Sequence, residues 1–151
     1  MRLPVDGTVA RGQLREDDHF ERGTIGDAYA TTFPVSLDAP LLDRGQERYD
    51  VYCAPCHGLS GHGDGIVARR AERLQQGTWV PPASLHVEPA YSRPVGHLYN
   101  SIANGIRTMP AYGSQIPVED RWAIVAYIKA LQRSQRAGLE DVPPDERQSL
   151  R

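Results

Sequence analysis

The chain has 151 residues, of which 40% are hydrophobic and 24% charged, and its formal net charge at pH 7 is −2. This length predicts one domain, which buries roughly two-thirds of its unfolded surface if all of it folds. The negative charge argues against nucleic acid as a partner. No stretch of about 18 apolar residues predicts a helix that crosses a bilayer.

Charge clusters and scattered glycine and threonine mark residues 1–37 as an N-terminal arm. The clusters are Arg15-Glu-Asp-Asp18 and Glu21-Arg22. We expect the arm to lie in extended form across a neighbouring subunit, because such a segment becomes ordered when a partner supplies contacts. The alternative is a solvated tail. Residues 138–151 are expected to form a polar C-terminal tail.

The segment between these ends, residues 38–137, begins and ends with a predicted helix. The first follows Asp38, a good N-cap with Pro40 in the first turn, and ends near Cys53. The last covers residues 117–136, with a proline and two acids in its first turn and an apolar stripe at helical spacing. The stripe consists of Ile124, Tyr127, Ile128 and Leu131.

Two shorter helices are expected between them. One covers residues 65–76 with Asp64 as N-cap, and the other covers residues 94–103 with Ser92 as N-cap. The segment 79–85 contains two prolines and is expected to be an extended loop. Because no segment alternates with period two for long, the sequence predicts an all-α domain with long connections.

Residues 53–57 read Cys-Ala-Pro-Cys-His, and Cys53 and Cys56 are the only cysteines. The spacing C-x-x-C-H is typical of c-type haem attachment, in which each thiol adds across a haem vinyl group and the histidine ligates the iron. We therefore expect Cys53 and Cys56 to anchor one covalent haem c and His57 to be its proximal ligand.

A dithiol redox pair and a zinc site also use the Cys-x-x-Cys spacing. A redox pair is expected after an apolar strand, whereas Cys53 follows a predicted helix. Zinc would need two further ligands, for which only histidines remain, and none has zinc-finger spacing. His62, His86 and His97 are expected to be surface or loop residues.

The second axial ligand is expected to be Met109, since the other methionine is Met1. A methionine ligand raises the reduction potential of the iron. Pro110 biases Met109 toward an extended backbone, and Gly105 and Gly113 allow turns on either side. The alternative is an ordinary gap-filling core methionine.

Haem would also fill a small domain that is rich in glycine and proline. Arg107 and Trp79 are candidate hydrogen-bond donors to a haem propionate, because a buried carboxylate must be paired or hydrogen-bonded. For Arg107 the alternative is a solvated loop residue. Tyr112 is expected to bound the haem crevice.

From Leu41 to Gln135 the chain resembles the class I cytochromes c. The resemblance rests on three features: the Gly45-x-x-x-Tyr49 helix before the Cys-x-x-Cys-His motif, the Met109-Pro110 loop, and the closing helix at residues 124–131. It implies the class I cytochrome c fold, with long loops around one haem. Gly45, Tyr49 and Tyr127 then predict a close crossing of the first and last helices.

The same resemblance implies contacts around the haem. Leu85 should pack against the porphyrin, and a carbonyl of Pro81 or Pro82 should accept the Nδ1 hydrogen of His57. Such a bond orients the imidazole and raises its basicity. The alternative is that Pro81 and Pro82 only stiffen the loop.

Residues 4–18, 61–70 and 120–135 resemble a narrower family, the monohaem cytochrome c subunit (ActE) of bacterial alternative complex III. This resemblance implies a membrane quinol-oxidising complex with multihaem cytochrome and iron–sulfur subunits as partners. An oxidase or a soluble carrier would accept the electrons. The haem would be a relay or exit site on the periplasmic face of the inner membrane, without a catalytic site of its own.

The start of the chain departs from that family. Its members generally carry an export signal with a lipid-modified cysteine, and Met1-Arg-Leu-Pro-Val5 shows neither. Because haem is attached outside the cytoplasm, we expect the signal to lie upstream of this sequence or to have been lost to a misplaced start. Membrane association would then come from partner subunits or from the missing anchor.

Coordination of the iron predicts the function. With His57 and Met109 both bound, no position is open to oxygen or peroxide, so we expect outer-sphere electron transfer. One alternative is a free-standing or oxidase-associated cytochrome c carrier. Another is a haem enzyme or gas sensor in which Met109 does not bind.

Overall fold

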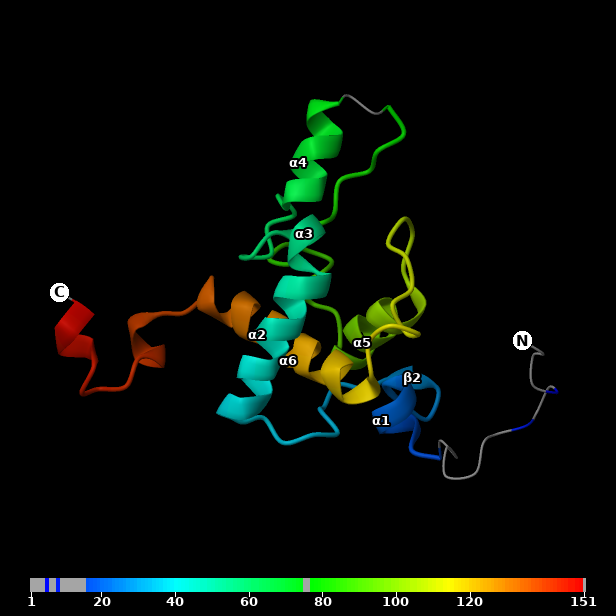
Figure 1. Ribbon diagram of the computed structural model, residues 1–151. Coiled ribbons are helices and arrows are strands. Elements are labelled where there is room, and N and C mark those ends of the chain that lie inside the picture. The colour runs from blue at the N-terminus through cyan, green and yellow to red at the C-terminus, as the bar shows by residue number, and fades with distance from the viewer. Residues whose placement is uncertain (1–4, 6–7, 9–15, 75–76, 151) are drawn as a thin grey trace.

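The computed structural model describes residues 5, 8, 16–74 and 77–150, and these are mostly helical (Figure 1). The helices are α1 (Asp18–Arg22), α2 (Ala39–Tyr52), α3 (Ala54–His57), α4 (Ile66–Arg73), α5 (Val95–Asn104) and α6 (Val118–Ser134), followed by the 3-10 turns η1 (Leu139–Asp141) and η2 (Arg147–Leu150). A short antiparallel hairpin joins β1 (Thr24–Ile25) to β2 (Ala28–Tyr29). The predicted helical fold is confirmed, with this hairpin as a small addition.

The crossing of α2 over α6 forms the centre of the fold. A Cβ atom on Gly45 would collide with the carbonyl of Ala123 and would lie 2.9 Å from Cβ of Tyr127, so only glycine fits here. Next to this contact the ring centroids of Tyr49 and Tyr127 are 5.3 Å apart. The close crossing expected from the sequence is present.

A bidentate ion pair supports the same crossing. Arg44 donates from Nε and Nη2 to the two carboxylate oxygens of Asp120 at 2.8 and 3.0 Å. Asp120 is only 8% exposed, so the guanidinium supplies the partner that a nearly buried carboxylate requires. The two residues are 76 positions apart, and the pair therefore joins distant parts of the chain.

The core lies between α6 and the helices that pack on it. Trp122, Ile124 and Val125 of α6 and Tyr49 of α2 are 0% exposed, and Tyr99 of α5 is 1% exposed. The rings of Tyr99 and Trp122 stack with centroids 4.6 Å apart. Helix α6 is thus buried by several elements at once.

The long helices begin where the sequence predicts. Asp38 caps α2, since its Oδ1 accepts a hydrogen bond from the backbone N of Leu41 at 2.9 Å. Pro117 is the N-cap of α6, and Glu119 and Asp120 occupy its first turn, where the helix dipole favours acids.

The predicted caps of the two shorter helices are wrong. Helix α4 begins after Gly65 and α5 begins after Pro94, neither of which offers a side-chain acceptor. Asp64 instead points its carboxylate at Gly58, and Ser92 donates its hydroxyl hydrogen to an upstream carbonyl.

The described part of the predicted arm, residues 16–37, folds back on the helical body. Helix α1 and the hairpin lie beside α5 and α6 (Figure 1). Trp122 donates from Nε1 to the carbonyl of Phe20 at 2.7 Å, and the hydroxyl of Tyr99 donates to the carbonyl of Glu21 at 2.8 Å. The expectation of an extended arm therefore fails for these residues.

Apolar side chains explain this difference. Phe20, Phe33 and Val35 pack against the core, and Ala30 is 1% exposed. Their burial outweighs the solvation of the charged clusters that suggested an arm. The rest of the predicted arm, apart from residues 5 and 8, lies outside the described residues.

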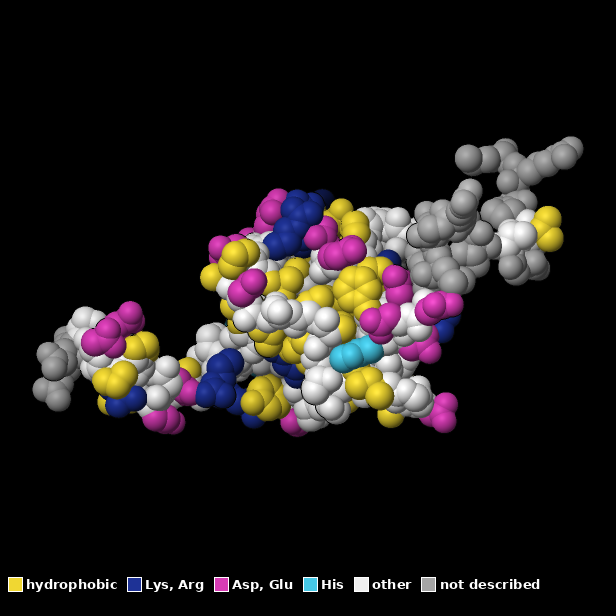
Figure 2. Space-filling model, turned by 90° about the horizontal axis from the view of Figure 1, so that it is seen from below, with side chains coloured by type: hydrophobic (Ala, Val, Ile, Leu, Met, Phe, Trp, Pro, Cys, Tyr) yellow, Lys and Arg dark blue, Asp and Glu magenta, His cyan; other side chains and the backbone are white. Residues whose placement is uncertain are grey.

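The described C-terminal residues 138–150 lie away from the helical body (Figures 1 and 2). An ion pair between Arg133 and Asp141 ties η1 to the end of α6, and most of the described side chains are exposed. Throughout the described ranges, no helix is both long enough and apolar enough to span a membrane.

Replacing Gly45 with alanine should destabilise the protein by about 2 kcal/mol, because the added methyl group forces α2 away from α6. Urea unfolding of the holoprotein, followed by circular dichroism, would measure the change. Gly77→Ala is the matched control, since a Cβ atom at Gly77 meets nothing within 4 Å. Equal stability of the two variants would contradict the role of the crossing.

Candidate functional site

The Cys-x-x-Cys-His motif occupies the junction of α2 and α3. Cys53 ends α2, and its carbonyl accepts hydrogen bonds from the backbone N of Cys56 at 3.1 Å and of His57 at 2.8 Å. The motif therefore forms a single helical turn, α3, that continues from the crossing helix. The hydroxyl of Tyr49 donates to the carbonyl of Gly58 at 2.8 Å and fixes the end of this turn.

Both cysteines are free and half-buried. Burial raises the pKa of the Cys53 thiol to about 12, with a smaller contribution from the neighbouring Cys56. Among the described residues, no three His, Cys, Asp or Glu side chains gather as a metal-binding cluster. The zinc alternative thus gains no further ligand from the described parts of the fold.

The loop after α3 is held against the segment that contains Leu85. The backbone N of Leu85 donates to the carbonyl of Gly61 at 2.8 Å, and the backbone N of Gly63 donates to the carbonyl of His57 at 2.7 Å. Gln132 of α6 donates from Nε2 to the carbonyl of Leu85 at 2.6 Å. Leu85 is 9% exposed and belongs to the core, and its contact with a porphyrin stays a prediction.

His57 has a buried Nδ1 atom with no hydrogen-bond partner of normal geometry. Burial lowers the pKa of His57, and the backbone of Ala83 partly opposes this shift. The expected acceptors were the carbonyls of Pro81 and Pro82, but the Pro82 carbonyl faces Gly63 and Pro81 is exposed. Ala83 is therefore the better assignment for the backbone group that orients the imidazole.

The segment around Met109 is a tight turn. Ile106 and Met109 exchange backbone hydrogen bonds of 3.0 and 2.9 Å, which holds the methionine in a short bridge. Met109 is half-buried and packs against the core. Arg107 lies at the tip of the turn with φ of 53°, in the left-handed region, and is exposed.

Tyr112 brings this loop beside the cysteines. Its ring lies 6.5 Å from that of Tyr52, the residue before Cys53. Its pKa is raised by burial and then by the nearby Cys56 and Cys53. The structure therefore places the end of the Met109 loop next to the Cys-x-x-Cys-His turn, and the role of Tyr112 at the edge of a haem crevice stays a prediction.

Trp79 lies against α4, where it lines a groove with Ile66, Val67 and Leu74. Its Nε1 is buried and has no acceptor among the described residues. An N–H group of this kind normally finds a partner, so Trp79 keeps a donor to spare for a bound group.

Arg121 is a positioning residue that sequence reasoning missed. It is 7% exposed and donates to the carbonyls of Ile116 and Gly113 at 2.8 and 2.7 Å and to the hydroxyl of Tyr99 at 2.8 Å. These bonds fix the return of the Met109 loop to α6. In the sequence, the only feature that distinguishes Arg121 is its position near the start of an amphipathic helix.

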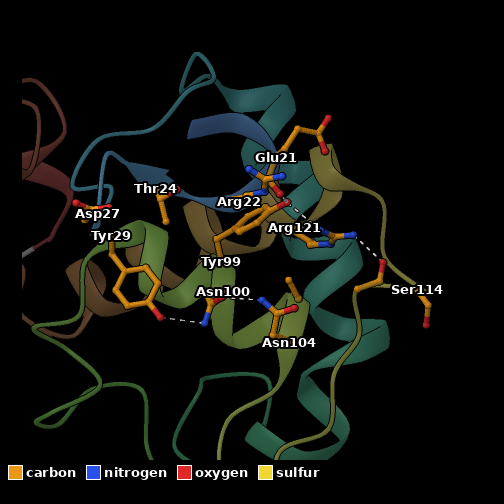
Figure 3. A pocket seen from close by; sticks show the side chains of 12 residues that line it. Glu21, Arg22, Thr24, Asp27, Tyr29, Tyr99, Asn100, Asn104, Ser114 and Arg121 are labelled. Carbon is orange, nitrogen blue, oxygen red and sulfur yellow. Dashed lines mark hydrogen bonds between the residues drawn. The ribbon is translucent and has the colours of Figure 1, made fainter. Parts of the chain in front are cut away.

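Arg121 also borders a polar hollow of about 790 Å³ between the hairpin, α5 and α6 (Figure 3). Tyr29, Asn100 and Asn104 line it in a hydrogen-bonded row. None of the predicted haem-binding residues lines this hollow. The hollow shares no lining residue with the cysteine motif.

The residues present fit a covalent haem. Two half-buried thiols and a half-buried imidazole lie on one turn, a thioether loop lies beside them, and the buried Nε1 of Trp79 has no acceptor among the described residues. Residues 40–128 match the family model described as cytochrome c oxidase, cbb3-type, subunit III. The chain belongs to this family. It is a c-type cytochrome domain, and this implies covalent haem c at Cys53 and Cys56.

A solved structure shows a similar fold. It is a chain of the Kuenenia stuttgartiensis reducing HAO-like protein complex, with a TM-score of 0.55 and 20% sequence identity. The match covers 76% of this chain and 54% of that chain, so the present sequence corresponds to about half of the longer protein. Curated proteins gave no significant match. At this identity the structural likeness shows the fold alone.

Tyr49→Phe should lower the free energy of unfolding by about 1–2 kcal/mol, because the buried carbonyl of Gly58 loses its hydrogen-bond donor. Amide hydrogen exchange should also become faster in the turn that follows His57. Tyr127→Phe, which changes the other ring of the same aromatic pair, is the control. If both variants lose the same stability and exchange equally, the Tyr49 hydroxyl has no special role.

Proposed function

We propose that this protein transfers electrons through one covalent haem c with His57 and Met109 as axial ligands. The observation that carries the proposal is the placement of the Met109 loop beside the Cys-x-x-Cys-His turn through Tyr112. When bound, haem would supply the reversible iron couple, and His57 and Met109 would be the side chains that hold its iron. The protein then needs no catalytic residue of its own.

The surrounding residues hold the ligands in place. The backbone of Ala83 orients the His57 imidazole, while burial of His57 keeps it in the neutral form that binds a metal. Leu85 excludes water from the core side of the site. Trp79 and Arg107 are the proposed donors to the haem propionates, with the unpartnered Nε1 of Trp79 in support.

We further propose that the chain is a relay or exit subunit of a membrane quinol-oxidising complex similar to alternative complex III. The resemblance of residues 4–18, 61–70 and 120–135 to its monohaem subunit supports this role. The partners would be a multihaem cytochrome and an iron–sulfur subunit, and the location would be the periplasmic face of the inner membrane. The similar solved chain also comes from a protein complex, which supports redox partners in general.

A second candidate is a cytochrome c domain associated with a terminal oxidase. The family description, which names subunit III of a cbb3-type oxidase, favours it. Both functions use the same haem site and differ only in the neighbouring subunits.

Met109→Ala should remove the weak red absorption band of iron–sulfur ligation and lower the reduction potential by on the order of tenths of a volt. The iron should also bind cyanide rapidly, because its sixth position is open. Thr108→Ala, an exposed neighbour in the same turn, should behave as the wild type. An unchanged spectrum in Met109→Ala would remove Met109 from the site.

Copurification distinguishes the two candidate assemblies. The tagged holoprotein, isolated from solubilised membranes of its host, should bring down a multihaem cytochrome and an iron–sulfur subunit identified by mass spectrometry. A haem–copper oxidase in their place would favour the second candidate and contradict the first.

A further inference from the structure

Helix α4 projects from the helical body and is held by α3, the turn that carries Cys56 and His57 (Figure 1). Its inner side is formed by Ala68 and Ala71, which are 5% and 8% exposed. All the other side chains of α4 are exposed.

The outer sides of α4 expose apolar side chains. Ile66 is 67% exposed, Val67 is 42% exposed and Leu74 is 49% exposed. They line a groove of about 380 Å³ along the helix together with Arg70, Ala71 and Trp79. Burial of each of these side chains would be favourable by about 25 cal/mol per Å² of apolar surface removed from water. A groove formed by adjacent exposed apolar side chains is typical of a site for contact with another molecule.

Three exposed arginines accompany these apolar side chains. They are Arg69, Arg70 and Arg73, and Glu72 is the one acidic residue on the helix. Among the described residues, no carboxylate lies within ion-pair distance of these three guanidinium groups. By contrast, Arg22, Arg44 and Arg133 elsewhere are each paired with a carboxylate. On the face seen from the side opposite α4, acidic and basic side chains are interspersed (Figure 2).

We propose that the α4 face is the docking surface for an acidic patch on the protein that exchanges electrons with the haem. We define this face by its apolar groove and by its three arginines. The inference rests on the proposed electron-transfer function and adds the chemistry of the partner. Docking on α4 brings that partner within one helix of the haem attachment turn.

Charge and shape favour this occupant over two others. Unpaired guanidinium groups bind carboxylates in a bidentate manner, which gives a protein partner both register and affinity. A second copy of the chain would bring the arginines of the two α4 helices together, and like charges at an interface are costly. The groove is concave and suits a projecting side chain, whereas a lipid surface would suit a convex apolar ridge.

The test measures electron transfer from the reduced holoprotein to two oxidants. Plastocyanin, an acidic blue-copper protein, accepts one electron from the ferrous haem as its Cu(II) becomes Cu(I). Tris(phenanthroline)cobalt(III), a small cation, accepts one electron without needing a basic docking surface. The α4 variant is Arg69→Glu/Arg70→Glu/Arg73→Glu. The control, Arg22→Glu/Arg93→Glu/Arg133→Glu, makes the same change in net charge at positions outside α4.

At an ionic strength of about 20 mM, the α4 variant should react with plastocyanin at least about tenfold more slowly than the control, and its rate should depend less on salt. The double variant Ile66→Ser/Leu74→Ser should slow the same reaction at every salt concentration, since it removes apolar contact. Reaction with the cobalt complex should stay unchanged or become faster in the α4 variant.

Equal plastocyanin rates in the α4 variant and the control would overturn the docking surface, while normal oxidation by the cobalt complex would leave the electron carrier intact. Failure of the wild type to reduce the cobalt complex would instead contradict the proposed function. Binding of the wild type to phosphatidylglycerol vesicles that is lost in the α4 variant, with no loss of plastocyanin rate, would assign the face to a membrane. A dimer that Leu74→Ser dissociates would assign it to a second copy, and either result would overturn the proposal.

Discussion

The backbone contact between Gly45 and Ala123 determines where α2 lies and therefore where the haem attachment turn begins. Because α2 continues directly into α3, any shift of α2 across α6 would move Cys53 and His57 with it. The ion pair of Arg44 with Asp120 prevents sliding along the crossing. The site is thus positioned by helix packing at a distance from it, and only then refined by local hydrogen bonds.

Helix α6 serves both sides of the proposed haem site. Gln132 near its end holds the carbonyl of Leu85 on the histidine side, and Arg121 near its start holds the return of the methionine loop. Both side chains are polar and almost completely buried, which is costly unless their hydrogen bonds are made. One helix therefore couples the two loops that carry or support the axial ligands.

The sequence predicted features that depend on local rules. Asp38 caps α2 because an acceptor and a following proline suffice for this, and Gly45 marks the crossing because no other residue fits. Asp64 and Ser92 failed as caps because Gly65 and Pro94 occupy the N-cap positions of α4 and α5. The sequence suggested Pro81 or Pro82, and not Ala83, as the backbone acceptor for His57. Which backbone group approaches the imidazole depends on how the loop folds over Gly61 and Gly63, and local rules do not predict this. Residues 16–37 were misjudged because their charges outnumber the few aromatic side chains that anchor them.

The separation of the two crossing helices along the chain bears on how the protein folds. Arg44 and Asp120 are 76 residues apart, so α2 cannot pack on α6 until residues far along the chain have been synthesised. The crossing that positions Cys53 and His57 is therefore a long-range contact. Because the loop-closure entropy must be overcome before such a contact forms, the crossing favours slower folding than the local helices alone would show.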